Sequence, residues 1–152
     1  MKIAVFSDSH RHSGWMIDHV LISKPDAVIF LGDILEDTLD FRSVFPGLPL
    51  YRVAGNCDFS YDDVLELELG GYRFLLCHGH QFRVKAGLER LHAEGARRRV
   101  DAVLFGHTHR QHAEIYDGIL YLNPGSASGF GGYCCAEITT GEKGLTYELI
   151  RA

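Results

Sequence analysis

Short apolar runs that end in Asp, Asn or His beside a glycine or serine are the feature that most constrains this chain. The runs are four to six residues long and rich in Val, Ile, Leu and Phe, which is typical of buried strands. Ligands of α/β sheets gather outside the carboxyl ends of strands, where loops carry function. We therefore expect six such ends to meet: Ser7-Asp8-Ser9-His10, Gly32-Asp33, Gly55-Asn56-Cys57-Asp58, His78-Gly79-His80, Gly106-His107-Thr108-His109 and Asn123-Pro124-Gly125-Ser126.

The order of expected strands and helices predicts an α/β protein with mixed sheets. Helices are expected between Ser13-Gly14 and Pro25, over Asp37–Val44 and over Val84–Arg98. Gly70-Gly71 and Asp117-Gly118 are tight-turn signals, so the second half favours antiparallel hairpins after an alternating first half. The expected strands are Ile3–Phe6, Ala27–Leu31, Leu50–Ala54, Val64–Leu69, Tyr72–Cys77, Ala102–Phe105, Ile119–Leu122, Tyr133–Ile138 and Leu145–Ile150.

Length and charge indicate how many domains the chain has and which partners its charge disfavours. The 152 residues show no linker or repeat, so a single domain over residues 1–152 is expected. A net charge of −5 argues against nucleic acid as a partner. The apolar start is too short for a signal peptide, and no run approaches the roughly 20 residues of a membrane span. We therefore expect a cytoplasmic protein without a membrane partner, whose four cysteines are buried free thiols. The oligomeric state stays open, and a homo-oligomer is compatible with the sequence.

The polar strand ends carry the ligands of a metal site. Asp, Asn and His without thiolates suit Mn, Fe, Co, Ni or Zn; we expect manganese first, with these others and Mg as alternatives. Seven candidates are too many for one ordinary ion, so two divalent ions that share a carboxylate are expected, as in sites that hydrolyse phosphate esters. The seven are Asp8, His10, Asp33, Asn56, His78, His107 and His109.

The order of these motifs resembles the calcineurin-like metallophosphoesterase superfamily. The motifs of that family are D-x-H, G-D, G-N-H-[DE], a single His and G-H-x-H. Here they stand as Asp8-Ser9-His10, Gly32-Asp33, Gly55-Asn56-Cys57-Asp58, His78 and Gly106-His107-Thr108-His109, with the family-like Asn123-Pro124-Gly125-Ser126 beyond. The small size is similar to the compact phosphodiesterase branch, which includes the related retromer subunit. The resemblance implies a four-layer α/β-β/α sandwich of two mixed β-sheets flanked by helices.

The resemblance also implies which residues serve the reaction. One metal would be held by Asp8, His10, Asp33 and His109. The other would be held by Asp33, Asn56, His78 and His107, so that Asp33 bridges the two. A metal-bridging water or hydroxide would attack phosphorus. The residues expected to take part in catalysis are Asp33, Asn56, Cys57, Asp58 and His80, with Asp58 orienting a neighbour and His80 bordering the cleft.

Cys57 stands where many larger members of the family carry a histidine that helps the leaving group depart. A thiol with a reference pKa of about 8.5 is a weak replacement for an imidazolium at neutral pH. We therefore expect a phosphodiesterase that acts on a small phosphate ester and turns over alkyl monoesters poorly. The alternatives are a phosphomonoesterase and a protein-binding scaffold on the same fold, which would tend to lose the ligands that are all present here. The natural substrate and the roles of Arg11, His12 and Ser126 stay open.

Overall fold

The computed structural model describes residues 1–152, which form ten strands, three α-helices and one 3₁₀ turn at His80–Phe82. The helices are α1 (Ser13–Ser23), α2 (Asp37–Val44) and α3 (Glu89–Arg98). The strands are β1 (Lys2–Phe6), β2 (Ala27–Phe30), β3 (Leu50–Arg52), β4 (Val64–Leu69), β5 (Tyr72–Cys77), β6 (Ala102–Leu104), β7 (Gln111–Tyr116), β8 (Ile119–Pro124), β9 (Cys134–Gly141) and β10 (Gly144–Arg151).

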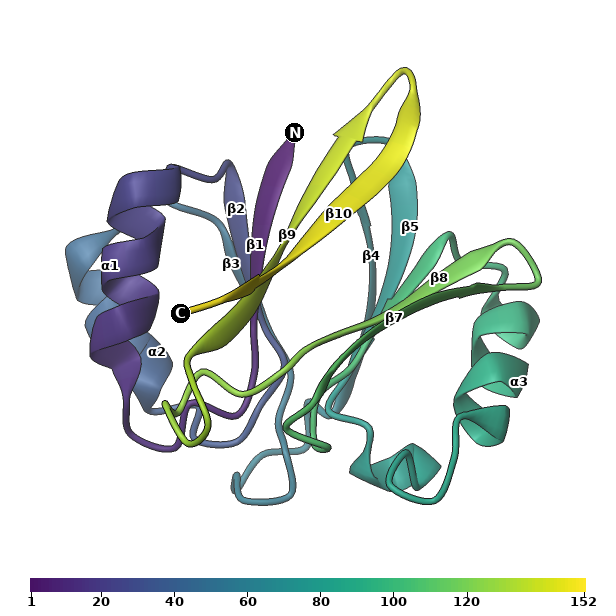
Figure 1. Ribbon diagram of the computed structural model, residues 1–152, viewed down its shortest axis with the longest axis horizontal. Helices are drawn as coiled ribbons and strands as arrows, with labels where there is room; N and C mark the ends of the chain where they lie inside the picture. Colours follow the sequence, from purple (N-terminus) through teal and green to yellow (C-terminus); the bar gives the residue numbers. More distant parts are fainter.

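Two five-stranded sheets stack face to face, with helices on the outside (Figure 1). The first sheet has the order β10-β9-β1-β2-β3, and the second has the order β4-β5-β6-β8-β7. Helices α1 and α2 cover the outer face of the first sheet, while α3 lies against the second (Figure 1). Each sheet contains parallel and antiparallel pairs. The predicted α/β sandwich of two mixed sheets flanked by helices is confirmed.

The strands in the middle of each sheet are apolar on both faces because both faces are buried. In β1, Ile3 and Val5 point into the core between the sheets, whereas Ala4 and Phe6 pack under α1 and α2. Side chains alternate between the two faces of a strand, so one short run contributes to two cores. This explains why these strands read as continuous apolar runs rather than as alternating ones.

Parallel pairing brings the polar strand ends to one end of the molecule. Strand β1 pairs in parallel with β2, and β6 pairs in parallel with β5 and β8. The loops that follow β1, β2, β5 and β6 therefore lie at the same end of the sandwich (Figure 1). None of the three helices is long and apolar enough to cross a membrane.

Three expectations from the sequence differ from the structure. Strand β7 was not expected; it is an edge strand paired only with β8, and its residues are half-buried or exposed, so it lacks an apolar run. Helix α3 begins at Glu89 rather than at Val84, because Gly87 has φ +148° and interrupts the segment. Cys57 is exposed, whereas the other three cysteines are buried free thiols as expected.

Candidate metal centre

Four of the predicted ligands converge where the loops after β1, β2 and β6 meet. They are Asp8, His10, Asp33 and His109, and one ligand atom from each lies within 4.8 Å of the others. Nε2 of His10 lies 3.3 Å from Nε2 of His109. Nε2 of His109 lies 3.1 Å from Oδ1 of Asp8. Residues from both sheets thus share one cluster.

A second group of predicted ligands lies on the other side of Asp33. Nε2 of the buried His78 is 3.4 Å from Oδ1 of Asp33 and 3.7 Å from Oδ1 of Asp8. The ring of His107 lies 5.1 Å from the ring of His78 between centroids. Asn56 is different: it is exposed, and its amide nitrogen lies 3.6 Å from Sγ of Cys57. The structure therefore places Asp8, His10, Asp33, His78, His107 and His109 close to one another, and Asn56 lies next to Cys57, whose backbone N–H contacts Asp33.

The donor atoms at the cluster fit a divalent cation. Oδ1 of Asp8 and Nε2 of His78 are buried and have no hydrogen-bond partner. Nδ1 of His78 lies 2.8 Å from the carbonyl oxygen of Leu31, which can only accept, so Nδ1 carries the proton and Nε2 presents a lone pair. Leaving such buried groups unsatisfied costs about 1–3 kcal/mol each. A cation between the carboxylates and the imidazole would satisfy both atoms.

Two members of the cluster, Asp33 and His107, are in the protonation states that metal ligands require, whereas the neighbouring carboxylates raise the pKa values of His78 and His109. Burial raises the pKa of Asp33, but the neighbouring His78 and the hydrogen bond from the backbone N–H of Cys57 outweigh it and hold this pKa well below its ordinary value. Burial, with the charge of Lys85, lowers the pKa of His107 to about 4. Asp33 is thus anionic and His107 neutral at pH 7, and only these forms bind a metal.

The backbone of the site is held in an uncommon conformation. Five of the predicted ligands have left-handed backbone angles, at φ between +44° and +67°: Asp8, His10, Asp33, His107 and His109. Non-glycine residues in this region cost about 1–3 kcal/mol each and cluster at functional sites. The conformation turns the side chain sharply after each strand ends, so that short side chains from separate loops meet.

Asp58 holds the Asp33 loop without facing the cluster. Its carboxylate accepts hydrogen bonds from the backbone N–H groups of Asp33 at 2.9 Å, Ile34 at 2.9 Å, Leu35 at 2.7 Å and Gly55 at 2.8 Å. Four amides on one carboxylate form a strong, charge-assisted set. These bonds hold the loop that carries Asp33, and that Asp58 orients Asp33 for metal binding stays a prediction.

Several supporting residues were not assigned a role from the sequence. The Ser7 hydroxyl donates to Oδ2 of Asp8 at 2.6 Å, and the Ser126 hydroxyl donates to the Asp8 carbonyl at 2.8 Å. The Asn123 amide donates to the Gly106 carbonyl at 2.8 Å. These residues lie beside or within the motifs, and their position there is the only sequence feature that could have indicated a supporting role. Their contacts fix the two loops that carry Asp8 and His107.

The remaining candidates border the cluster. The ring of His80 lies 5.6 Å from that of His78 and 6.1 Å from that of His107, and its buried Nδ1 has no hydrogen-bond partner. Burial lowers the pKa of His80. The backbone N–H of Cys57 donates to Oδ1 of Asp33 at 3.0 Å, and burial and the charge of Asp33 raise the pKa of its thiol. Arg11 and His12 are exposed.

Comparisons with known proteins point to one family. The model of the calcineurin-like phosphoesterase superfamily domain matches residues 1–141. A probable metallophosphoesterase of Mycoplasma pneumoniae is 33% identical over 130 residues, which cover 82% of this chain and 78% of the relative. A phosphodiesterase of Methanocaldococcus jannaschii is 25% identical over an alignment of 161 residues, which covers 86% of each chain.

Solved structures show the same architecture. The crystal structure of a predicted phosphoesterase from Streptococcus pneumoniae matches with a TM-score of 0.82 and 28% identity, over 99% of this chain and 88% of that one. Vps29 of Entamoeba histolytica, solved in complex with zinc, matches with a TM-score of 0.76 and 20% identity over 99% of each chain. The second likeness shows a shared fold and no more.

Proposed function

Because this chain belongs to the calcineurin-like phosphoesterase superfamily, we propose that it is a metal-dependent phosphodiesterase that hydrolyses a small phosphate ester. The observation that carries the proposal is the position of Asp33. Its Oδ2 lies 3.8 Å from Nε2 of His10, and its Oδ1 lies 3.4 Å from Nε2 of His78. One carboxylate therefore faces both groups of candidate ligands, which is the arrangement that a dinuclear centre needs.

The residues that would hold the two cations divide at Asp33. Asp8, His10 and His109 would hold one cation together with Asp33. His78, His107 and Asn56 would hold the other, again together with Asp33. Bound there, divalent cations would lower the pKa of a coordinated water and offset the charge that develops on the phosphoryl group. Manganese is the first candidate, and nickel, cobalt, iron, zinc and magnesium are the others.

The other residues of the site set which esters react. His80 borders the cluster, and its pKa is lowered by burial, so it is neutral at pH 7 and one ring nitrogen can donate to a phosphoryl oxygen. The thiol of Cys57 has a raised pKa and is a weak acid at neutral pH. An alkoxide leaving group would receive little help from it. This supports a preference for diesters and for esters with good leaving groups.

A protein-binding scaffold is the second candidate function, because Vps29 shares the fold. The buried, unpartnered atoms of Asp8 and His78 favour the enzyme, since a scaffold gains nothing from keeping them. A phosphomonoesterase is the third candidate, and the exposed Cys57 weighs against it. The four unpaired cysteines support a reducing compartment, and we place the protein in the cytoplasm.

A metal-reconstituted activity screen tests the proposal. The protein is stripped of metal, reloaded with each of the six cations, and assayed with bis-p-nitrophenyl phosphate and p-nitrophenyl phosphate while bound metal is measured on the same sample. We expect hydrolysis only in metal-loaded protein, with the diester faster than the monoester. No hydrolysis at full metal occupancy would favour the scaffold. A faster monoester would favour the phosphomonoesterase.

A further inference from the structure

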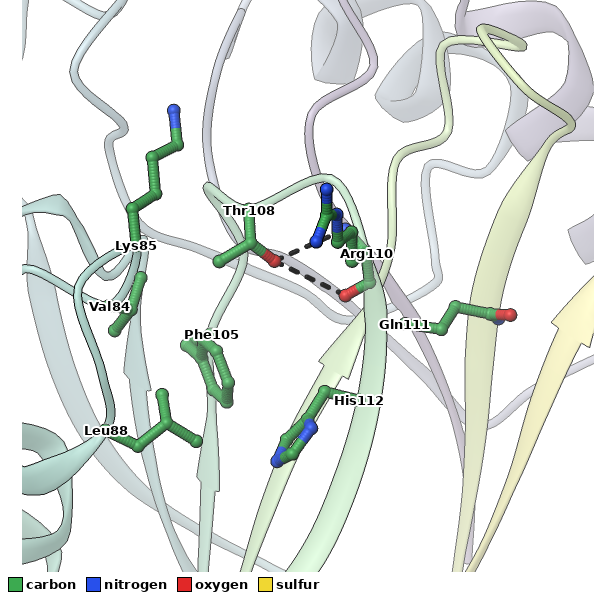
Figure 2. A pocket seen from close by; sticks show the side chains of 8 residues that line it. All are labelled: Val84, Lys85, Leu88, Phe105, Thr108, Arg110, Gln111 and His112. Carbon is green, nitrogen blue, oxygen red and sulfur yellow. Dashed lines mark hydrogen bonds between the residues drawn. The ribbon is translucent and has the colours of Figure 1, made fainter.

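A cavity of about 540 Å³ lies directly beside the loop that carries His107 and His109 (Figure 2). This volume is within the range of about 300–1,000 Å³ that is usual for small-molecule sites. None of the residues that line the cavity belongs to the candidate metal centre. We call it the Phe105 pocket, and its principal lining residues are Val84, Lys85, Leu88, Phe105, Thr108 and Arg110.

The loop that carries His107 and His109 also lines the Phe105 pocket. Thr108 lies between the two histidines in sequence, and its side chain lines the pocket. Its hydroxyl accepts a hydrogen bond from Nδ2 of Asn123 at 3.1 Å and one from the backbone N–H of Arg110 at 3.3 Å. These bonds fix the side chain in place. A ligand with its phosphoryl group at the metal centre would enter the pocket by passing Thr108.

The floor of the Phe105 pocket suits a flat apolar group. Val84 and Phe105 are buried, and Leu88 is half-buried. The ring of His112 lies 6.3 Å from that of Phe105 at an angle of 57°, so two rings border the same space. Buried Nε2 of His112 has no hydrogen-bond partner. Aromatic groups pack well against such tilted rings and aliphatic side chains.

The mouth of the Phe105 pocket is positively charged. Figure 2 shows the charged ends of Lys85 and Arg110 on one side of the pocket, with Leu88 and His112 on the opposite side. A ligand with an anionic end and an apolar end would thus be oriented in one direction only.

We propose that the Phe105 pocket binds a planar aromatic substituent of the phosphate ester, while Lys85 and Arg110 attract the phosphoryl charge at its mouth. The proposal rests on the proposed function for the nature of the anion. It assigns the substrate class as aryl or heteroaryl phosphate esters. It also separates two contributions: Leu88 acts on the organic group, and Lys85 acts on the phosphoryl group whatever its substituent.

Phenylphosphonate and methylphosphonate are the probes, because their P–C bonds are not hydrolysed. Dissociation constants are measured by NMR titration of the full chain loaded with diamagnetic zinc. We expect phenylphosphonate to bind about tenfold more tightly, from the burial of its ring, and to shift the amide signals of residues 84–88. Leu88→Trp should remove this preference by filling the pocket. Lys85→Met should weaken both ligands alike.

Two variants serve as matched controls. Leu21→Trp on the exposed face of α1 and Lys143→Met in the β9–β10 turn should leave both constants unchanged. Equal binding of the two phosphonates by the wild-type protein would overturn the proposal, as would a preference that persists in folded Leu88→Trp. If that variant does not fold, the wild-type titration decides: phenyl-specific shifts at residues 84–88 support the pocket, and their absence refutes it. If the protein bound phenylphosphonate as expected but hydrolysed no ester, the proposed function would be refuted and the pocket proposal would stand.

Discussion

Oδ1 of Asp33 lies 3.4 Å from Nε2 of His78, although the two residues come from different sheets. Burial would favour the neutral carboxylic acid, yet the neighbouring His78 and the hydrogen bond from the backbone N–H of Cys57 keep the carboxylate ionised. The pair therefore joins the two halves of the sandwich at a point where Nε2 of His78 has no hydrogen-bond partner. This makes Asp33 the residue on which both groups of candidate ligands depend.

Asp33→Asn should weaken the binding of both cations, because Asp33 is expected to hold each of them. An amide cannot bridge two cations with two anionic oxygens, and loss of residues that merely support a ligand already costs about 10- to 100-fold. We expect a loss of diesterase activity of at least about 100-fold and fewer than half of the metal ions retained, measured by elemental analysis. Asp18→Asn on exposed α1 is the matched control. Unchanged activity would refute the bridging assignment.

Asp58→Ala should weaken the site through the loop that carries Asp33. It removes the acceptor of four backbone N–H groups, so a loss of roughly 2–3 kcal/mol in the free energy of unfolding is expected. Urea unfolding measures this loss. Asp58→Asn keeps one oxygen and should recover part of both stability and metal affinity, whereas Asp62→Ala in the same exposed segment should change neither. A normal metal affinity in Asp58→Ala would contradict the positioning role.

Gly106→Ala should disturb the Asp8 loop because there is no room for a side chain. A Cβ at this position would lie 2.0 Å from Oγ of Ser7 and 2.8 Å from Oδ2 of Asp8. Both atoms are buried, so they have little space to move. We expect a lower melting temperature and weaker metal binding, by differential scanning calorimetry and zinc titration. Gly47→Ala, where nothing lies within 4 Å, is the control and should behave as the wild type.

Much of the fold was predictable because the strands are short and buried on both faces. A run such as Ile3–Phe6 is apolar throughout, and the polar residues that follow it mark the strand end directly. Parallel pairing then implies that the ends meet. Edge strand β7 had no such signal, since none of its residues is buried. The expectation of a buried Cys57 is wrong, because this residue lies in the turn that follows the apolar run Leu50–Ala54.

The convergence of the site was predictable from residue types, but its supporting contacts were not. Asp58 reaches back to amides 23 to 25 positions earlier in the chain, and no local pattern indicates such a contact. The left-handed backbone at Asp8 and His107 is imposed by hydrogen bonds from distant segments. The exposed side chain of Asn56 likewise depends on the shape of its turn.

Glu94 gives the protein a dependence on pH that lies outside the metal centre. Hydrogen bonds from Arg97 and Arg98 lower the pKa of Glu94 to about 2. A depressed carboxylate pKa contributes stability above the unfolded value, and this contribution is lost as the pH falls toward the folded value. Glu94→Gln should therefore lower the free energy of unfolding by about 0.5–1 kcal/mol at pH 7 and by less at pH 3. Urea unfolding at both pH values checks this, with exposed Glu142→Gln as control. If Glu94→Gln lowered the free energy of unfolding equally at pH 7 and pH 3, the stabilising role assigned to the Glu94 carboxylate would be contradicted.

Cys57→His should shift the enzyme toward monoesters. The residue is exposed beside Asp33, and its thiol has a raised pKa, so it donates a proton to a leaving group only weakly at pH 7. An imidazole with a reference pKa of about 6.5 would donate more readily, and general acid catalysis contributes about 100-fold or more where it operates. We expect the monoester rate to rise about tenfold or more relative to the diester rate, measured with p-nitrophenyl and alkyl esters. Cys57→Ser, which offers no stronger acid, should keep the wild-type ratio. A wild-type enzyme that already hydrolyses monoesters faster than diesters would refute the role assigned to Cys57.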